Sequence, residues 1–202
     1  MRVQKLSEKT MSAALAALKR GEVVLCPTDT VYGFLADASN KKTVDKIYKL
    51  KKRPRSKPLP VFVKDFAMAS AIAEIDEKQA KILKKFWPGK YTFVLQRKPG
   101  VKVYTTAKKI PIAKQSRILD EVGTIAIRIP KHAFLQRLLK KIHRPLVQTS
   151  VNISNQAPMS HIQDIIDTFG KNNILIIDAG NLKKSKPSTI TDLTSKKPKK
   201  LR

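Results

Sequence analysis

Cysteine is almost absent from this chain, since Cys26 is the single one among 202 residues. One cysteine cannot form an intramolecular disulfide, and no cluster of cysteine and histidine has the spacing of a zinc site. This usage is typical of a reducing compartment, so we expect a cytoplasmic protein. No run approaches the roughly eighteen apolar residues that a membrane-spanning helix needs, and the basic N-terminus lacks the apolar stretch of a secretory signal. We therefore expect no membrane partner.

Acidic and aromatic residues are also scarce. Only 15 Asp and Glu face 42 Lys and Arg, which gives a net charge of +27 with the three histidines counted as neutral. Such a charge attracts polyanions, because each neutralised phosphate releases counterions. It fits RNA, a nucleotide, or a lysine-rich surface without a specific ligand. Aromatic residues make up 6% and do not interleave with the basic stretches, which disfavours a base-stacking platform for single strands.

Familiar catalytic motifs are missing as well. The chain has no Gly-x-x-x-x-Gly-Lys-Ser/Thr phosphate loop, no Gly-x-Gly-x-x-Gly, no His-Glu-x-x-His and no Gly-x-Ser-x-Gly. The three histidines show no partner pattern, and we interpret Cys26, at the end of an apolar strand, as inert packing. The sequence therefore gives no sign of a nucleophilic triad or of a zinc-dependent mechanism.

Short apolar runs alternate with helical patterns along the chain. Helices are expected between Ser7 and Gly21, between Asn40 and Pro54, and over 76–86, 131–142 and 160–169, with Ser7, Asn40 and Ser160 as N-caps. Strands are expected over 23–26, 59–63, 91–96, 124–129, 146–149, 174–177 and 189–193, with a long loop over 98–121. This alternation favours one layered α/β domain over residues 1–202, with at least part of its sheet parallel.

Polar loops follow several of the expected strands. Residues 27–33 and 150–154 each come directly after an apolar strand, and the basic segment 51–57 follows the second helix. In α/β sheets ligands bind beyond the carboxyl ends of strands, where backbone N–H groups converge. Hydroxyl and amide side chains orient a polar ligand, while Lys and Arg neutralise phosphate or carboxylate. Each loop alone also fits turn chemistry, but together they predict a small-anion or nucleotide site.

These loops form a recognisable set of motifs in a fixed order. The motifs are Pro27-Thr-Asp-Thr-Val-Tyr-Gly33, Leu50-Lys-Lys-Arg-Pro54 with Lys57-Pro-Leu59, Phe86-Trp-Pro-Gly89 with Thr92, Gly123-Thr-Ile-Ala-Ile-Arg-Ile-Pro130, Thr149-Ser-Val-Asn-Ile-Ser154, and Pro187-Ser-Thr-Ile-Thr-Asp-Leu-Thr194 with Leu201-Arg202. Taken together they resemble the YrdC-like threonylcarbamoyl-AMP synthase family, from about residue 10 to the last residue, in its short single-domain form.

The resemblance implies a fold and an activity. The fold is a twisted, mixed but mostly parallel sheet flanked by helices, with a basic concave cleft. The activity makes L-threonylcarbamoyladenylate and pyrophosphate from L-threonine, bicarbonate and ATP, for the threonylcarbamoyladenosine modification of tRNA. The implied partners are these substrates, threonylcarbamoyl-transferase proteins downstream, and tRNA or double-stranded RNA on the basic face. Mg²⁺ is expected to enter bridged to ATP, without dedicated protein ligands.

The resemblance also assigns roles to residues. The family's Lys-x-Arg and Ser-x-Asn signatures fall on a catalytic group of four: Lys51, Arg53, Ser150 and Asn152. The residues implied for ATP are Arg53, Lys57, Thr124, Ser150 and Arg202. Those implied for threonine are Thr30, Arg128, Ser188 and the main chain near Gln148. No metal ligand is expected. These roles require no side-chain nucleophile, because the carbamate of threonine itself attacks the α-phosphate.

Two departures from the family pattern bear on the site. Phe62 stands where many relatives carry a histidine near threonine, so that contact is not expected here. Asn155 stands where a glycine usually follows Asn-x-Ser. Asparagine tolerates a left-handed backbone better than most residues, so we expect the turn to be kept.

Two other readings of the sequence stay open. The first is a non-enzymatic YrdC-like protein that binds RNA or the ribosome, which the charge of +27 favours. The second is a carbamoyl-transferring relative from hydrogenase maturation, although such modules belong to much longer chains. The presence of both signatures together favours the enzyme.

Overall fold

The computed structural model describes residues 2–105, 123–183, 185–195 and 197–202. The helices of this part of the chain are α1 (Glu8–Lys19), α2 (Lys41–Leu50), α3 (Phe66–Ile72), α4 (Glu77–Phe86), α5 (Ala133–Ile142), α6 (Ile162–Phe169) and the 3₁₀ turn η1 (Gly170–Asn172). The strands are β1 (Arg2–Lys5), β2 (Val24–Cys26), β3 (Gly33–Asp37), β4 (Val61–Phe62), β5 (Tyr91–Gln96), β6 (Thr124–Arg128), β7 (Leu146–Ser150), β8 (Leu175–Asp178), β9 (Thr189–Asp192) and β10 (Lys199–Lys200).

The strands form one mixed sheet in the order β1-β8-β2-β3-β7-β4-β6-β5-β9-β10. The prediction of a mixed sheet is confirmed, but the expectation that it is mostly parallel is wrong. Within the described residues, five of the nine neighbouring pairs are antiparallel. The reason is a short connection: the loop 27–32 returns the chain at once from β2 to β3, and so short a link can join only antiparallel strands.

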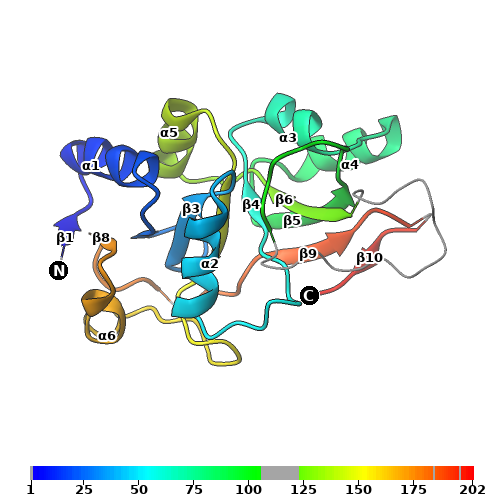
Figure 1. Cartoon of the computed structure of the whole chain (residues 1–202). Coiled ribbons are helices and arrows are strands. Elements are labelled where there is room, and N and C mark those ends of the chain that lie inside the picture. Colours follow the sequence, from blue (N-terminus) through cyan, green and yellow to red (C-terminus); the bar gives the residue numbers. More distant parts are fainter. Residues whose placement is uncertain (1, 106–122, 184, 196) are drawn as a thin grey trace.

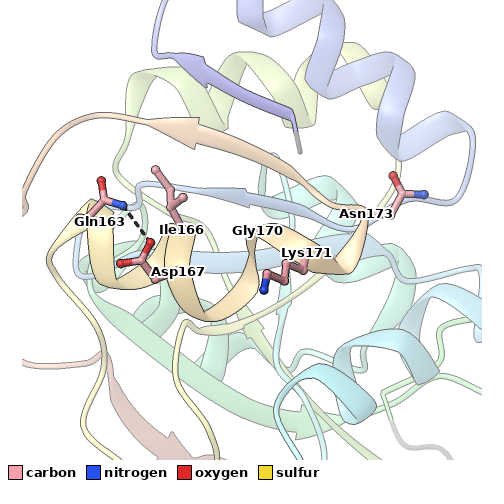
Figure 2. Close-up of a pocket in the computed structure, with 6 residues that line it drawn as sticks. All are labelled: Gln163, Ile166, Asp167, Gly170, Lys171 and Asn173. Carbon is pink, nitrogen blue, oxygen red and sulfur yellow. Dashed lines mark hydrogen bonds between the residues drawn. The ribbon is translucent and has the colours of Figure 1, made fainter.

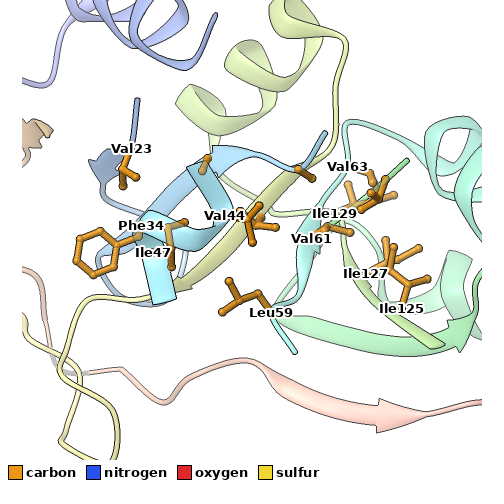
Figure 3. Close-up of a cluster of buried hydrophobic side chains, with 14 of the residues drawn as sticks. Val23, Phe34, Val44, Ile47, Leu59, Val61, Val63, Ile125, Ile127 and Ile129 are labelled. Atoms are coloured by element: carbon orange, nitrogen blue, oxygen red, sulfur yellow. The ribbon is translucent and has the colours of Figure 1, made fainter. Parts of the chain in front are cut away.

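Helices pack on both faces of the sheet (Figure 1). The side chains of alternate residues in a strand point to opposite faces, so each strand contributes to the packing on both sides. In β2, Val24 and Cys26 pack with α1 and α5, whereas Leu25 belongs to the larger core on the opposite face. Figure 3 shows that larger core, where Val44 and Ile47 of α2 lie among the side chains of the sheet. Burial raises the pKa of the Cys26 thiol, as expected for a cysteine that serves only as packing.

The ends of the helices follow from local side-chain chemistry. Ser7 and Asn40 cap α1 and α2 as predicted, each accepting a hydrogen bond from a backbone N–H in the first turn. Gly21 follows α1 with φ +72, a conformation that favours glycine. The cap of α6 is His161 rather than the expected Ser160.

Three strands and one helix were not expected from the sequence. The strands β1 and β10 are short and largely polar, and α3 spans only seven residues. The strand β3 is buried along its whole length, so it lacks the alternation that marks a half-exposed strand. Of the loop expected over 98–121, residues 98–105 contain neither helix nor strand, and residues 106–122 lie outside the described residues. None of the described helices is long and apolar enough to cross a membrane.

Candidate active site

The two signatures of the sequence meet through the side chain of Lys51. Lys51 follows α2, and its side chain is 1% exposed. Its Nζ donates hydrogen bonds to the main-chain oxygen of Ser150 at 2.6 Å, the main-chain oxygen of Asn152 at 3.1 Å and Asn152 Oδ1 at 2.5 Å. Ser150 Oγ also donates to Asn152 Oδ1 at 2.9 Å. We call this group of Lys51, Ser150 and Asn152 the lysine clasp.

The clasp explains how three of the four residues assigned to catalysis come together. Burial lowers the pKa of Lys51 to about 7, and the charge of Arg53 acts in the same direction. Its donors point at acceptors of the 150–152 loop, so Lys51 fixes the shape of this loop. Asn155 has φ 71, which confirms that the following turn is kept without a glycine.

Arg53 is anchored on the next loop. Its Nε donates to the main-chain oxygen of Lys57 at 3.0 Å, and its Nη2 donates to that of Pro58 at 3.0 Å. The Tyr48 hydroxyl lies against the same Lys57 oxygen at 2.9 Å and also reaches the main-chain oxygen of Thr105. The side chain of Lys57 itself is exposed. Arg53 is therefore oriented by backbone carbonyls, and no carboxylate of the described residues pairs with it.

Arg128 is the largest fully buried side chain of the described residues, at 1% exposure. Its Nε donates to the main-chain oxygen of Gly89 at 2.9 Å, and its Nη2 donates to Asp29 Oδ1 at 2.5 Å. The guanidinium carbon lies 5.4 Å from the centre of the Phe62 ring, a cation–π contact. In place of the histidine seen in many relatives, Phe62 thus supports the arginine.

Thr30 lies in the tight turn that holds Asp29. The Thr28 hydroxyl accepts hydrogen bonds from the backbone N–H groups of Thr30 and Val31, and it lies 3.0 Å from the Thr30 hydroxyl. Thr30 is 6% exposed. This turn and the Asp29–Arg128 ion pair bring two residues assigned to threonine close to each other.

Ser188 and Arg202 form another cluster. Arg202 donates from Nε to the main-chain oxygen of Ser188 at 3.1 Å and from Nη2 to Ser188 Oγ at 3.3 Å. The Thr92 hydroxyl donates to Ser188 Oγ at 3.0 Å. A backbone pair between Arg202 and Ile190 holds this segment beside β9.

Two further predicted residues lie on the strands between these clusters. Gln148, at 7% exposure, lies on β7, and its amide nitrogen would be 2.9 Å from a Cβ added at Gly33. A side chain at position 33 would therefore have to displace the Gln148 amide from this place. Thr124 is the exposed first residue of β6 and lies on the same face as Arg128, four residues further along the strand.

The clusters are linked electrostatically through three guanidinium groups. Burial lowers the pKa of Arg202, and the charges of Arg53 and Arg128 lower it further. Because such an effect decreases with distance, Arg53 and Arg128 each lie close enough to Arg202 for their charges to act on it. Arg128 lies on β6 and Arg202 pairs with Ile190 of β9, and the strands β6, β5 and β9 are consecutive in the sheet. Cations gathered in a partly buried place are able to bind an anion.

Two hollows of the surface lie outside this arrangement. One, of about 630 Å³, is formed on α6 and η1, where the Gln163 amide donates to Asp167 at 2.9 Å (Figure 2). The other, of about 730 Å³, lies between α2 and α6, with Lys46, Lys49 and Lys52 around apolar side chains. Neither hollow is lined by a predicted site residue.

The sequence reasoning missed two residues that support the site: Asp29 and Tyr48. Asp29 could have been found from the sequence, because it lies in a loop expected to hold an anion. A carboxylate there would repel the anion unless an arginine neutralised it. Tyr48 gave no such signal, since its spacing is that of a core residue of α2. Within the described residues, no group of three or more His, Cys, Asp or Glu could hold a metal ion.

The fold and these clusters define an α/β protein that gathers cations and hydroxyl groups on neighbouring strands. Within that class, the chain belongs to the Sua5/YciO/YrdC family: residues 16–202 match the family profile, which is described as "Telomere recombination". The family expectation from the sequence is confirmed.

Several curated relatives are similar over most of this chain. A provisionally named threonylcarbamoyl-AMP synthase of Methanocaldococcus jannaschii is 34% identical over 201 residues, with 98% of this chain and 88% of the relative covered. The threonylcarbamoyl-AMP synthase of Pyrococcus abyssi is 30% identical over 200 residues, with 98% of this chain and 55% of the relative covered. The threonylcarbamoyl-AMP synthase of Bacillus subtilis is 30% identical over 175 residues, with 86% of this chain and 47% of the relative covered. The chain thus spans about half the length of the last two.

Solved structures share the fold. Sua5 of P. abyssi in complex with L-threonine has a TM-score of 0.81 and 30% identity, covering 100% of this chain and 56% of that one. A doubly substituted variant of the same protein reaches a TM-score of 0.86 at 28% identity, with 100% and 57% covered. YciO of E. coli has a TM-score of 0.82, with 100% and 92% covered, and at 23% identity it shows the fold alone.

Proposed function

We propose that this chain is a threonylcarbamoyl-AMP synthase, which converts L-threonine, bicarbonate and ATP into L-threonylcarbamoyladenylate, pyrophosphate and water. The observation that carries the proposal is that Arg53 and Arg128, from distant parts of the chain, lie close enough to Arg202 for their charges to lower its pKa. The names of the curated relatives support this activity, and so does the threonine complex of P. abyssi Sua5.

In this proposal the nucleotide lies against the basic loops. Arg53 and Arg202 neutralise the triphosphate, and their orientation by backbone carbonyls supports this role. The other ATP contacts of the proposal are Lys57, Thr124 and Ser150. The lysine clasp fixes the Ser150 loop before the nucleotide binds.

The amino acid lies beside the nucleotide in the proposal. Arg128 receives the carboxylate of threonine, because it is a buried cation with N–H donors beyond those used for Gly89 and Asp29. Thr30, Ser188 and the main chain near Gln148 contact the rest of the molecule. Hydroxyl and amide groups of this kind orient a small polar substrate without reacting with it.

The chemistry requires positioning more than a side-chain nucleophile. The amine of threonine attacks the carbon of bicarbonate and water leaves, which gives a carbamate. An oxygen of the carbamate then attacks the α-phosphorus of ATP, and the bond to the β-phosphate oxygen breaks to release pyrophosphate. The three arginines hold the reacting groups together and offset the charge of the phosphates.

We also propose that Mg²⁺ enters with the triphosphate, where it would neutralise phosphate charge. Asp29, the carboxylate paired with Arg128, is already used by that arginine and by the backbone N–H of Lys131. The donor set of the described site therefore fits a metal held by phosphate oxygens rather than by protein ligands. Contacts with tRNA and with downstream threonylcarbamoyl-transferase proteins belong to the proposal too, supported only by the charge of +27 and by the family.

Pyrophosphate release tests the function directly. The purified chain is incubated with ATP, L-threonine and bicarbonate, and each substrate is then omitted in turn. The proposal requires that release depends on both threonine and bicarbonate. Pyrophosphate release that does not depend on threonine, or does not depend on bicarbonate, would contradict the proposed synthase activity. Binding of double-stranded RNA with a steep salt dependence, but without this activity, would instead support the non-enzymatic alternative.

A further inference from the structure

Asp29 connects two segments of the site that are far apart in the sequence. Its Oδ1 accepts the 2.5 Å hydrogen bond from Arg128 Nη2, and its Oδ2 accepts one from the backbone N–H of Lys131 at 3.1 Å. The exposed fractions of the Asp29 and Arg128 side chains are 8% and 2%. One oxygen of the carboxylate is thus tied to the last residue of β6 and the other to the segment that follows this strand.

Arg128 is held from three directions by this arrangement. Gly89 accepts its Nε hydrogen, Asp29 accepts one Nη2 hydrogen, and the Phe62 ring supports the face of the guanidinium. These bonds use two of the five N–H donors of an arginine. Because the guanidinium is planar and rigid, fixing two donors also fixes the direction of the other three.

The Asp29 carboxylate accepts hydrogen bonds from Arg128 and from the backbone of Lys131, and its charge also acts on the neighbouring His132. Burial lowers the pKa of His132, although the charge of Asp29 acts in the opposite direction. Burial thus favours the neutral form of this imidazole. Asp29 also lies next to Thr30 in the turn built on the Thr28 hydroxyl. One carboxylate thus fixes the relative placement of Thr30 and Arg128.

We propose that Asp29 is a positioning residue for the amino acid substrate. It holds the Arg128 guanidinium so that the remaining N–H donors meet the substrate carboxylate, and it keeps Thr30 beside them. Asp29 therefore sets the affinity for the amino acid and leaves the affinity for the nucleotide unchanged. The inference rests on the proposed function, because it assigns the amino acid carboxylate to Arg128.

The test measures binding of L-threonine and of ATP separately by calorimetry. Asp29→Asn keeps the shape of the side chain but removes the charge. We expect it to weaken threonine binding by about tenfold to hundredfold, the value of a charge-assisted contact, and to change ATP binding by less than about twofold. Asp29→Glu restores the charge and is expected to recover part of the threonine affinity.

Asp37→Asn is the matched control. Asp37 is also a buried carboxylate, at 3% exposure, and its Oδ2 pairs with Arg144 at 2.7 Å at the far end of β3. We expect it to lower thermal stability as Asp29→Asn does, but to leave threonine binding unchanged. The inference is overturned if Asp29→Asn changes threonine and ATP binding equally or neither of them, or if Asp37→Asn gives the same selective loss.

The wild-type protein separates the two hypotheses. If it binds threonine but releases no pyrophosphate that depends on threonine and bicarbonate, the synthase assignment fails and the role of Asp29 is still decided by the binding data. If the wild-type protein does not bind threonine at all, both hypotheses are wrong.

Discussion

The basic side chains of this protein form two populations. Lys51 and Arg128 are each 1% exposed and donate to fixed oxygen acceptors, whereas Lys78 and Lys81 on α4 lie in solvent. In the formal charge of +27, a buried Lys or Arg counts the same as an exposed one. Burying a cation raises the free energy of the folded state unless its N–H donors are hydrogen-bonded. Lys51 and Arg128 are therefore each buried next to acceptors that satisfy them. The total charge of the chain therefore indicates only that it attracts anions. The cations that are buried and hydrogen-bonded to fixed acceptors indicate where a binding site lies.

The largest effect is expected from removing the buried lysine. Lys51→Met keeps most of the volume but leaves the acceptors of Ser150 and Asn152 without their donor. We expect pyrophosphate release to fall by more than about a hundredfold, and the free energy of unfolding to fall by about 3 kcal/mol. Activity assays and urea unfolding measure the two effects. Near wild-type values of both the pyrophosphate release rate and the free energy of unfolding would show that the lysine clasp contributes neither to activity nor to stability.

A smaller effect, confined to activity, is expected at Arg53. Its half-buried side chain donates to two backbone oxygens, so Arg53→Ala removes a cation from the site without opening the core. We expect pyrophosphate release to fall by about a hundredfold while the melting temperature changes by only a few degrees. Arg137→Ala, which removes an exposed arginine on α5, is the control and should leave activity unchanged. A near wild-type rate for Arg53→Ala would refute its assignment.

The environment of Lys51 also predicts how stability depends on pH. Its pKa falls from an ordinary value of 10.5 to about 7, mainly through burial. Between these values the unfolded chain binds more protons than the folded one, so the free energy of unfolding rises with pH. We expect wild type to gain on the order of 1 kcal/mol per pH unit relative to Lys51→Met between pH 7 and 9. A difference that stays flat or shrinks over this window would show that the acceptors keep the ammonium charged.

The smallest effect is expected from the exposed population. The double variant Lys78→Gln/Lys81→Gln removes two charges from the solvent side of α4. We expect pyrophosphate release within about twofold of wild type and unfolding within about 0.5 kcal/mol, because exposed residues without fixed partners contribute little. A loss of activity as large as that of Arg53→Ala would remove the distinction between the two populations.

The fold was predictable to the extent that it rests on local patterns. Amphipathic periodicity and the caps at Ser7 and Asn40 located the main helices. The strand β3 was not predicted because it is buried on both faces and begins at Gly33, within a stretch whose sequence is typical of a turn. Missing it also led to the wrong expectation of a mostly parallel sheet, since β3 makes antiparallel pairs on both sides.

The site was predictable where motifs carry the signal. The signature residues Lys51, Ser150 and Asn152 do meet, although Lys51 and Ser150 are 99 positions apart. Asp29 was missed because its partner, Arg128, is also 99 positions away, and no local spacing relates the two. Tertiary ion pairs of this kind become visible only when the strands are placed next to each other.

A structure with L-threonine and a non-hydrolysable ATP analogue bound tests the central claim most directly. The account predicts that the phosphates lie between Arg53 and Arg202, with the threonine carboxylate on the N–H groups of Arg128 that Asp29 leaves available. Ligands bound at either surface hollow beside α6, with these three arginines free of contacts, would contradict it.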